Sequence, residues 1–499
     1  MSERERAARR ERLEALRKSG IDPYPARVGP REAIADVRVR FEHRDAESLE
    51  ADPEGVAVAG RITAIRSFGK LLFLNLVENG AKIQVSAKKN EIAPELFQRI
   101  KSFDVADFVR VEGPVWRTRT DELTVDAVDA QLLAKALRPL PEKWHGLTDV
   151  EARFRQRYLD LLVNEEVRQI ALLRSCTIAA MRAFLDGRGF VEVETPVLQP
   201  LYGGAAARPF NTHHNTYDQD LYLRISDELY LKRLVVGGLD RVYEIAHNFR
   251  NEGVSRKHNP EFTMMECYQA YADYRDMMDL TEAMVAAAID RIGGGYKRSY
   301  GDLEIDYTLP WPRKTYAELL EEHAGLSMTD LDAIRAKATE LEIDHTGMAD
   351  AIVVNEVFEA TVEPKLIQPC FVLDYPAPIC PLTRRRPDDP NIALRFEAFV
   401  AGMEIGNAYT ELNDPAIQEE NFKRSLAGER KDETMAVLDE DFLLALKYGM
   451  PPAGGLGVGI DRLVMLLTDS TSIRDVILFP LQRPLPKEDD AQNVDRSPV

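Results

Sequence analysis

RVYEIAHNFRNEGVSRKHNPEFTMMECYQAY, residues 241–271, contains two β-rich runs joined by a charged loop. Neighbouring side chains on a strand point to opposite faces, so residues two apart share a face. Arg250 and Glu252 therefore point the same way before Gly253 ends the first run. The second run carries four side chains on one face, namely Phe262, Met264, Glu266 and Tyr268. If the two runs pair, they form an antiparallel hairpin with one chemically rich face.

The residues of this hairpin indicate a site for an anion and a base. Arginine can bridge a carboxylate and a phosphate through paired hydrogen bonds, which makes Arg250 the central residue. Phe262 offers a ring for stacking, and the Arg-Lys-His run at residues 256–258 adds cations suited to terminal phosphates. The alternative is an exposed hairpin with a ladder of surface salt bridges. That alternative suits Arg250 or Glu252 alone, whereas the full combination favours an ATP-dependent site that activates a carboxylate.

A second group of polar residues lies in RFEAFVAGMEIGNAYTEL, residues 395–412. The central Val-Ala-Gly is typical of a tight turn, which would place Glu397 and Glu404 opposite each other across a hairpin. Two close carboxylates repel unless a cation holds them, and such oxygen ligands suit Mg²⁺ with bound phosphates. The strand beyond carries a polar row on one face, namely Asn407, Tyr409 and Glu411. An exposed polar strand is the alternative interpretation of this row.

Two glycine-bearing regions also contain candidate residues for the site. PPAGGLGVGIDRLVMLL, residues 451–467, runs from small glycines into a helix whose first turn holds Asp461 and Arg462. Glycine lets a backbone approach a ligand closely, but the G-x-G-x-G spacing matches neither a dinucleotide-binding loop nor a P-loop. In GGAAARPF and LRISDELYLKRL, residues 203–210 and 223–234, Gly204 also permits close approach. Glu228 is expected in a helical salt bridge unless a ligand uses its carboxylate.

Residues 151–484 mix helices and strands without strict alternation, which favours an α+β domain with an antiparallel sheet flanked by helices. Residues 151–190 are predicted as one long helical stretch that ends at Gly187 and Gly189. RGFVEVETPVL, residues 188–198, adds a strand and Pro196, and could lie at a dimer interface. The Pro-bearing residues 138–150 are predicted as a linker, and the polar residues 485–499 as a disordered tail.

The N-terminal part of the chain has a different pattern. Residues 1–50 are predicted as a helical extension, because Leu13 and Leu16 recur at helical spacing among charges. Residues 51–137 contain five short β-rich runs separated by Gly, Asn-Gly and charged turns. Five runs in this length favour a five-stranded OB-type β-barrel, with an SH3-like barrel as the alternative.

The overall composition is that of a globular protein. The 499 residues are 45% hydrophobic and 29% charged, enough for two or three domains. No window approaches a membrane span, and the charged N-terminus lacks the apolar run of a secretory signal. The four widely spaced cysteines predict reduced thiols in a cytoplasmic protein. The net charge of −19 argues against general nucleic-acid binding, so RNA contacts would need a local basic face.

Three segments resemble the motifs of class II aminoacyl-tRNA synthetases. Phe249-Arg250-Asn251-Glu252 is similar to motif 2, GLGVGIDR at residues 455–462 to motif 3, and the Pro196 segment to motif 1. Residues 203–210, 248–274, 407–415 and 459–480 resemble lysyl-tRNA synthetases specifically. The resemblance covers residues 8–484. Tyr409 and Cys380 stand where Phe and Ser are usual.

The resemblance implies a role for each matching residue. Arg250 would bridge the lysine carboxylate and the α-phosphate of ATP, and it would be catalytic together with Arg462. ATP would be held by Arg250, Glu252, His258, Phe262, Glu404 and Arg462. Lysine would be held by Gly204, Glu228, Arg250, Glu266, Tyr268, Asn407, Tyr409 and Glu411, with Glu228 at its α-amino group and Glu411 at its ε-ammonium group. Mg²⁺ would be held by Glu397 and Glu404, and an anticodon base by Phe73 and Gln84, unless Phe73 packs in the barrel core.

These expectations describe a lysine–tRNA ligase that uses ATP, L-lysine and tRNA(Lys), requires Mg²⁺ and forms a homodimer. An aspartyl- or asparaginyl-tRNA synthetase would need cations where Glu266 and Glu411 stand. A lysyl ligase that modifies a protein would lack the barrel. A non-catalytic RNA-binding or regulatory paralogue would have lost Arg250, a metal carboxylate or Arg462.

Overall fold

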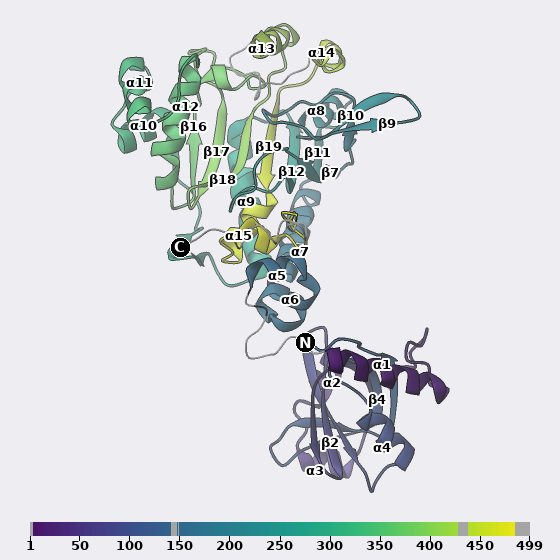
Figure 1. The fold of residues 1–499 in the computed structure, drawn as a ribbon. Coiled ribbons are helices and arrows are strands. Elements are labelled where there is room, and N and C mark those ends of the chain that lie inside the picture. Colours follow the sequence, from purple (N-terminus) through teal and green to yellow (C-terminus); the bar gives the residue numbers. More distant parts are fainter. Residues whose placement is uncertain (1–2, 141–146, 148, 428–437, 485–499) are drawn as a thin grey trace, which may run out of the picture. The chain divides into compact units, whose positions relative to one another are not determined.

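The computed structural model describes residues 3–140, 147, 149–427 and 438–484. The chain divides into two compact units, Met1–Asp149 with Tyr158–Glu165, and Val150–Arg157 with Glu166–Val499. Figure 1 shows the helices and strands of each unit. The predicted tail and most of the predicted linker, residues 141–146 and 148, lie outside the described residues.

The first unit is built on a six-stranded sheet. Its strands are β1 (Gly55–Phe68), β2 (Leu71–Glu78), β3 (Ala81–Lys88), β4 (Phe108–Arg117), β5 (Leu123–Asp126) and β6 (Asp129–Ala134). The pairings β1–β2, β2–β3, β3–β5, β5–β4 and β4–β1 form a ring, and β6 adds to β4. Five strands therefore form the ring, as predicted. The last predicted run is two strands because the chain bends at Val128.

Alternation along these strands separates an apolar interior from a polar outer face. Leu72, Leu74 and Leu76 of β2 are buried in the core of this unit. The helices of the unit are α1 (Glu3–Lys18), α2 (Ile34–Phe41), α3 (Ala46–Ala51), α4 (Pro94–Lys101) and α6 (Arg157–Val163). Helix α4 begins with a proline at a position where its missing N–H is harmless, and buries Leu96 and Phe97 against the strands.

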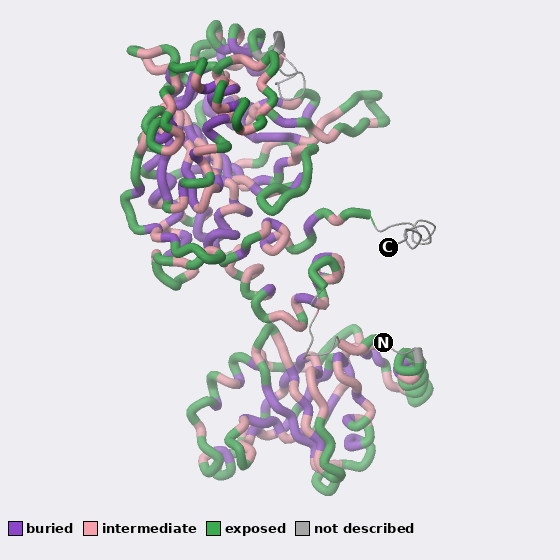
Figure 2. The backbone as a smooth tube through the Cα atoms, turned by 60° about the vertical axis from the view of Figure 1, so that its left-hand side comes forward, coloured by how far each residue is buried: buried purple, intermediate pink, exposed green. Residues whose placement is uncertain are grey.

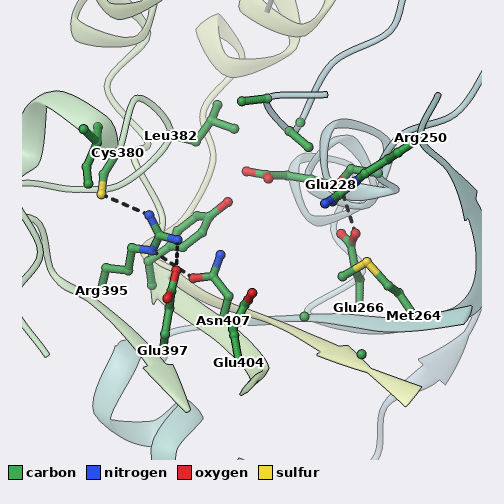
Figure 3. Close-up of a pocket in the computed structure, with 18 of the residues that line it drawn as sticks. Glu228, Arg250, Met264, Glu266, Cys380, Leu382, Arg395, Glu397, Glu404 and Asn407 are labelled. Carbon is green, nitrogen blue, oxygen red and sulfur yellow. Dashed lines mark hydrogen bonds and ion pairs between the residues drawn. The ribbon is translucent and has the colours of Figure 1, made fainter. Parts of the chain in front are cut away.

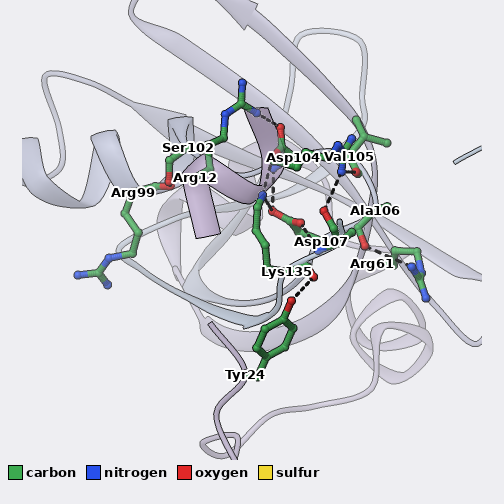
Figure 4. Close-up of polar contacts among 12 residues, drawn as sticks. Arg12, Tyr24, Arg61, Arg99, Ser102, Asp104, Val105, Ala106, Asp107 and Lys135 are labelled. Carbon is green, nitrogen blue, oxygen red and sulfur yellow. Dashed lines mark hydrogen bonds and ion pairs between the residues drawn. The ribbon is translucent and has the colours of Figure 1, made fainter. Parts of the chain in front are cut away.

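A buried ion cluster joins distant parts of the first unit (Figure 4). The fully buried Nζ of Lys135 lies 2.5 Å from Asp104 Oδ2 and 2.7 Å from Asp107 Oδ2. Asp104 also pairs with Arg12 of α1, and the Tyr24 hydroxyl donates to the backbone carbonyl of Lys135 at 2.9 Å. Each oxygen of Asp107 accepts a backbone N–H at 2.8 Å. The cluster fastens the N-terminal helix to the strands, and every oxygen of Asp107 has a partner.

The second unit contains an eight-stranded sheet in the order β15-β16-β17-β18-β19-β12-β11-β7. All neighbours are antiparallel except the edge pairs β15–β16 and β11–β7. Its strands are β7 (Val191–Glu192), β11 (Arg241–Phe249), β12 (Glu261–Ala270), β15 (Arg313–Thr315), β16 (Cys370–Leu373), β17 (Arg395–Val400), β18 (Met403–Thr410) and β19 (Ala453–Gly459). Smaller sheets are formed by β8 (Leu198–Gln199), β9 (Asn211–His214) and β10 (Gln219–Leu223), and by β13 (Lys297–Tyr300) and β14 (Leu303–Asp306). The predicted hairpin of residues 241–271 is the β11–β12 pair.

The helices of this unit are α5 (Val150–Arg155), α7 (Glu165–Asp186), α8 (Glu228–Val236), α9 (Tyr274–Ile292), α10 (Tyr316–Ala324), α11 (Leu331–Glu340), α12 (Asp350–Thr361), α13 (Pro415–Ala427), α14 (Glu440–Lys447), α15 (Ile460–Leu467) and α16 (Ile473–Val476). The prediction of one helical stretch over residues 151–190 is wrong, because α5, α6 and α7 are separate. At the first break the buried Arg157 donates to the carbonyls of Leu478 and Arg474, each at 2.9 Å. These long-range hydrogen bonds outweigh the local helical preference.

The eight-stranded sheet has one apolar and one polar face. On β12, Met265 and Cys267 belong to the apolar core, whereas Met264 and Glu266 line a cavity. Helices α9 and α15 contribute many residues to this core, so they cover the apolar face. Figure 2 shows the buried residues gathered in the interior of each unit. The cavity therefore lies on the face opposite the core.

Strands β17 and β18 are joined by a two-residue loop, residues 401–402, with φ angles of 52° and 66°. Positive φ at both positions fits a tight hairpin turn, as predicted. The predicted register is wrong, because Glu397 lies opposite Asn407 and Glu404 lies opposite Phe399. The ladder skips Ile405, which forms a β-bulge. This extra residue turns Glu404 to the cavity face that also holds Asn407.

Candidate active site

A cavity of about 1010 Å³ opens on the polar face of the eight-stranded sheet (Figure 3). Residues from β12, β17, β18, β19, α8 and α12 and from the segments 204–206 and 250–260 line it. Among them are the predicted residues Gly204, Glu228, Arg250, Glu252, His258, Phe262, Glu266, Tyr268, Glu397, Glu404, Asn407, Tyr409 and Arg462. Glu411 is not part of this lining. The sequence motifs, far apart along the chain, thus meet in one cavity.

The glycines of β19 let side chains approach the sheet closely. A Cβ atom at Gly455 would lie 2.0 Å from Glu411 Oε1 and 2.5 Å from Tyr268 Cε1. Such distances are impossible for real side chains, so this position requires glycine. Gly455 lines the cavity, and Glu411 lies directly beside it.

Arg250 is held just after β11, where its backbone N–H donates to Pro260 O at 2.8 Å. Its guanidinium lies over the Phe262 ring, 5.1 Å from the centroid. Burial lowers the pKa of Arg250, although Glu252 and Glu404 oppose the shift. The buried Nε of Arg250 has no hydrogen-bond partner among the described residues. A buried guanidinium with an unused donor is suited to an anionic ligand.

Arg462, in the first turn of α15, connects two other predicted residues. Its Nη1 donates to Glu404 O at 2.8 Å and Oε2 at 3.3 Å, and its Nη2 lies 3.0 Å from His258 Nε2. Because a guanidinium can only donate, His258 Nε2 accepts this hydrogen bond. Burial, Arg462 and Lys257 lower the pKa of His258, so its ring is neutral and Nδ1 carries the proton toward Ser255 Oγ, 2.9 Å away. Together with Arg250, these side chains place two guanidinium groups at one end of the cavity.

Glu266 marks the acidic end of the cavity. Its carboxylate accepts hydrogen bonds from Ser226 Oγ at 3.0 Å, from the N–H of Asp227 at 3.3 Å and from Tyr268 OH at 3.5 Å. Burial and the nearby Glu228 raise the pKa of Glu266 to about 7. A cationic ligand would stabilise its charged form.

Lys232 of α8 was missed by the sequence predictions. Its buried Nζ lies 2.5 Å from Glu228 Oε1 and 2.5 Å from Glu411 Oε2. Glu228 therefore makes the predicted helical salt bridge and also lines the cavity. Glu411 Oε1 is buried without a hydrogen-bond partner among the described residues. The spacing of Glu228 and Lys232, four residues apart on a helix, was the available sequence signal.

Glu397 and Glu404 line the cavity and have the character of metal ligands. Tyr375 OH donates to Glu397 Oε2 at 2.9 Å, and Arg395 contacts the other oxygen. Burial raises the pKa of Glu397 to about 7, with Glu404 adding repulsion and Arg395 opposing it. The residues described by the structure contain no cluster of three or more metal-ligating side chains. Two carboxylates that repel each other nevertheless fit Mg²⁺, because this ion often takes its remaining ligands from phosphates and water.

Arg395 is a second residue that the sequence predictions missed. It donates to Asn407 Oδ1 at 3.0 Å and to Cys380 Sγ at 3.3 Å, in addition to its contact with Glu397. Figure 3 shows these side chains converging. Burial raises the pKa of Cys380, so its thiol stays protonated. Arg395 thus fixes a candidate metal ligand relative to the predicted lysine pocket.

Residues 149–483 match the family described as tRNA synthetases class II (D, K and N). Over 484 residues the chain is 51% identical to the lysine–tRNA ligase of Moorella thermoacetica, covering 96% of this chain and 97% of the relative. The corresponding enzyme of Pelotomaculum thermopropionicum is 51% identical, covering 95% and 94%. That of Carboxydothermus hydrogenoformans is 49% identical, covering 95% and 97%. The chain belongs to the lysine–tRNA ligase family.

The first unit of this class II synthetase also has a family match. Residues 56–133 match an OB-fold nucleic acid binding domain, which confirms the OB prediction over an SH3-like barrel. Phe73 lies outside the apolar core formed by the described residues, so the alternative of core packing is wrong. Arg66 donates to Gln84 Oε1 at 2.6 Å and lies 5.8 Å from the Phe73 centroid, and Gln84 donates to Thr124 Oγ1 at 3.0 Å. An aromatic ring, an amide and a guanidinium therefore meet on the polar face of the barrel.

The Pro196 segment of this synthetase leaves apolar side chains exposed. Val191, Val197 and Leu198 are 51%, 41% and 48% exposed. Neighbouring exposed apolar residues are typical of an interaction surface. All four cysteines are free. No described helix is both long enough and apolar enough to cross a membrane.

Proposed function

We propose that this protein is a lysine–tRNA ligase that activates L-lysine with ATP and transfers it to the 3′ end of tRNA(Lys). The observation that carries the proposal is a single cavity that holds groups for a nucleotide and groups for a cationic amino acid. One end contains the guanidinium groups of Arg250 and Arg462 with the candidate metal ligands Glu397 and Glu404, and the acidic end contains Glu228 and Glu266 with Glu411 beside it. The names of the similar ligases support the same activity.

In the first step a carboxylate oxygen of lysine attacks the α-phosphorus of ATP. The bond from that phosphorus to the bridging oxygen breaks, which gives lysyl-adenylate and pyrophosphate. Arg250 would hold the attacking carboxylate and the α-phosphate together, so its free donor acts where negative charge is greatest. Phe262 offers its ring to adenine, while Arg462 contacts phosphate oxygens and the neutral His258 orients Arg462 by accepting its hydrogen bond.

Glu397 and Glu404 would hold Mg²⁺. When bound, the ion supplies positive charge to the phosphate oxygens. Tyr375 and Arg395 orient Glu397, and Arg462 orients Glu404. These contacts hold both carboxylates on one face of the sheet before ATP arrives.

In the second step the terminal ribose hydroxyl of tRNA attacks the carbonyl carbon of the adenylate. The bond from that carbon to the phosphate oxygen breaks, the hydroxyl proton passes to the departing AMP phosphate, and the aminoacyl ester forms. Phe73 would stack on an anticodon base while Gln84 forms a hydrogen bond with it. A homodimer formed through the Pro196 segment and a cytoplasmic location belong to the same proposal.

Selection of lysine follows from the acidic end. A neutral side chain would leave the buried Glu266 without a cation, and an acidic one would be repelled. The acidic end therefore disfavours the aspartyl and asparaginyl alternatives. Arg250, both candidate metal ligands and Arg462 lie in one cavity, which disfavours a non-catalytic paralogue.

ATP–pyrophosphate exchange with a panel of amino acids tests the proposal. Exchange should depend on L-lysine, and Arg250→Ala should reduce it by about 1000-fold, because a donor used in the transition state is lost. Arg313→Ala is a matched control, since Arg313 is half-exposed, pairs with Asp279 and does not line the cavity. Exchange supported equally by aspartate, or retained in Arg250→Ala, would overturn the assignment.

A further inference from the structure

Lys232 places a third positive group beside the proposed substrate site, in addition to the arginines. Its side chain has no solvent exposure, and its Nζ lies 2.5 Å from both Glu228 Oε1 and Glu411 Oε2. The ammonium also lies 5.4 Å from the ring centroid of Tyr409. Helix α8 supplies Lys232 and Glu228, whereas Glu411 directly follows β18. Lys232 therefore ties the helix to the sheet at the acidic end of the cavity.

The two carboxylates that share Lys232 belong to opposite ends of the proposed substrate. Glu228 is expected at the α-amino group of lysine and Glu411 at its ε-ammonium group. Glu411 gives Oε2 to Lys232 and keeps the buried Oε1 without a hydrogen-bond partner among the described residues. A single internal ammonium group thus fixes both carboxylates and leaves an acceptor for the substrate.

Lys232 also affects the net charge of the acidic end of the cavity. With Glu228, Glu266 and Glu411 ionised, three negative charges and the one positive charge of Lys232 leave a net charge of −2. The two ammonium groups of lysine balance this charge, while its carboxylate is left to Arg250. Burial raises the pKa of Glu411 to about 8 although Lys232 opposes the shift, so loss of Lys232 would favour the protonated form further.

We infer that Lys232 is a positioning and specificity-determining residue, which holds Glu228 and Glu411 at the spacing that an amino acid with two ammonium groups needs. The inference rests on the proposed function, because lysine is taken as the substrate. It needs no direct contact between Lys232 and the substrate. Among described residues, the titratable groups around Lys232 and Glu411 are Glu228 on α8, Glu266 and Tyr268 on β12, and Tyr409 on β18.

Lys232→Met tests the inference, because methionine keeps the length of the side chain and removes its charge. The KM for lysine in the exchange reaction should rise about 100-fold, as expected when buried charged partners are lost, while the KM for ATP stays unchanged. Glu411, whose pKa burial already raises to about 8, should then bind a proton more tightly, so the fall of the lysine KM with rising pH should move to higher pH in the variant. In the unaltered protein this fall should be centred near pH 8.

Lys135→Met is the matched control, since Lys135 is equally buried and bridges two carboxylates of the first unit. It should leave the lysine KM unchanged. Equal changes in the KM values for lysine and ATP in Lys232→Met, or an unaltered lysine KM and pH profile, would overturn the role of Lys232. In those cases lysine-dependent exchange by the unaltered protein would still support the proposed function.

If Lys232→Met does not fold, Lys232→Arg decides the question, because it keeps the positive charge but changes the position of the donors. The KM for lysine should rise about tenfold, since the spacing of Glu228 and Glu411 is altered, while the KM for ATP stays unchanged. An unchanged lysine KM would refute the inference. Absence of lysine-dependent exchange in the unaltered protein would instead count against the proposed function.

Discussion

Two buried lysines, one in each unit, bridge carboxylates in the same way but leave them in different states. Lys135 contacts Asp104 and Asp107, and Lys232 contacts Glu228 and Glu411, all at 2.5 to 2.7 Å. Both oxygens of Asp107 accept backbone hydrogen bonds. One oxygen of Glu411 has no hydrogen-bond partner among the described residues.

This difference separates a cluster that holds a fold together from one prepared for a ligand. A buried acceptor without a partner destabilises the protein, so its persistence calls for an explanation. Beside a cavity that also exposes Glu228 and Glu266, a cationic substrate supplies that explanation. Among the described residues, both oxygens of Asp107 already have partners without any ligand.

The largest expected effect is on stability, in Lys135→Met. Removing this cation leaves Asp104 and Asp107 buried together, which should lower the free energy of unfolding of the first unit by about 3–5 kcal/mol. Urea unfolding followed by circular dichroism measures the loss. Lys314→Met removes a lysine from a half-exposed pair with Glu322 and should barely change stability. Similar midpoints for both variants would mean that the buried cluster does not hold this unit together.

The next largest effect is on substrate affinity, in Glu411→Gln. This change keeps the shape of the side chain but removes the charge that the substrate ammonium would meet. The KM for lysine should rise about 100-fold with little change in the KM for ATP. Asp107→Asn, the corresponding change in the first unit, should affect stability and leave both KM values alone. If Glu411→Gln behaves like Asp107→Asn, the two clusters are both structural and the comparison fails.

Local sequence patterns predict the parts of the site that lie along single strands. The two-residue period of β12 placed Phe262, Glu266 and Tyr268 on one face, and the structure puts all three in the cavity lining. The same period failed at Glu404, because a bulge at Ile405 shifts the ladder by one residue. A bulge is set by how two strands pair, and the sequence of one strand does not reveal it.

Lys232 and Arg395, which bridge other side chains, were missed because their contacts also depend on how separate elements pack together. The partners of Lys232 and of Arg395 come from different elements, so their meeting depends on the completed fold. The helix break at Arg157 is similar, since its hydrogen-bond acceptors lie near residue 478. In the first unit the period of the strands identified the barrel, but it gave no sign of the Lys135 cluster. The sequence thus indicates which strand faces carry functional side chains. Tertiary contacts decide the positions and the charges of those side chains.

A third prediction concerns pH and follows from opposite pKa shifts in the two units. At Asp104, Lys135 and Arg12 outweigh burial and lower the pKa, whereas burial and Glu228 raise the pKa of Glu266 to about 7. Glu266 is therefore protonated below that pH and loses the negative charge that attracts lysine. The kcat/KM for lysine should fall about sixfold between about pH 7 and pH 6, as the ionised fraction of a group with this pKa does.

The nucleotide end should follow this profile less closely at saturating Mg²⁺, because a bound cation would keep Glu397 ionised although its pKa is about 7 without the ion. Burial, Arg462 and Lys257 lower the pKa of His258, which favours its neutral ring, so the KM for ATP should change less than the kcat/KM for lysine. Glu266→Gln should give a low and nearly pH-independent kcat/KM for lysine. A parallel decline for ATP would assign the titration to a group other than Glu266.

The smallest effect is expected at the polar face of the barrel, in Phe73→Leu. Phe73 lies in the same unit as Lys135 but outside its core, so the substitution should leave the unfolding midpoint nearly unchanged. Loss of ring stacking on a base should lower kcat/KM for tRNA(Lys) charging by about fivefold. ATP–pyrophosphate exchange without tRNA should be unaffected, because it uses only the cavity of the second unit. A lowered midpoint like that of Lys135→Met would instead show that Phe73 supports the barrel, and an equal loss in both assays would show that it does not act through tRNA.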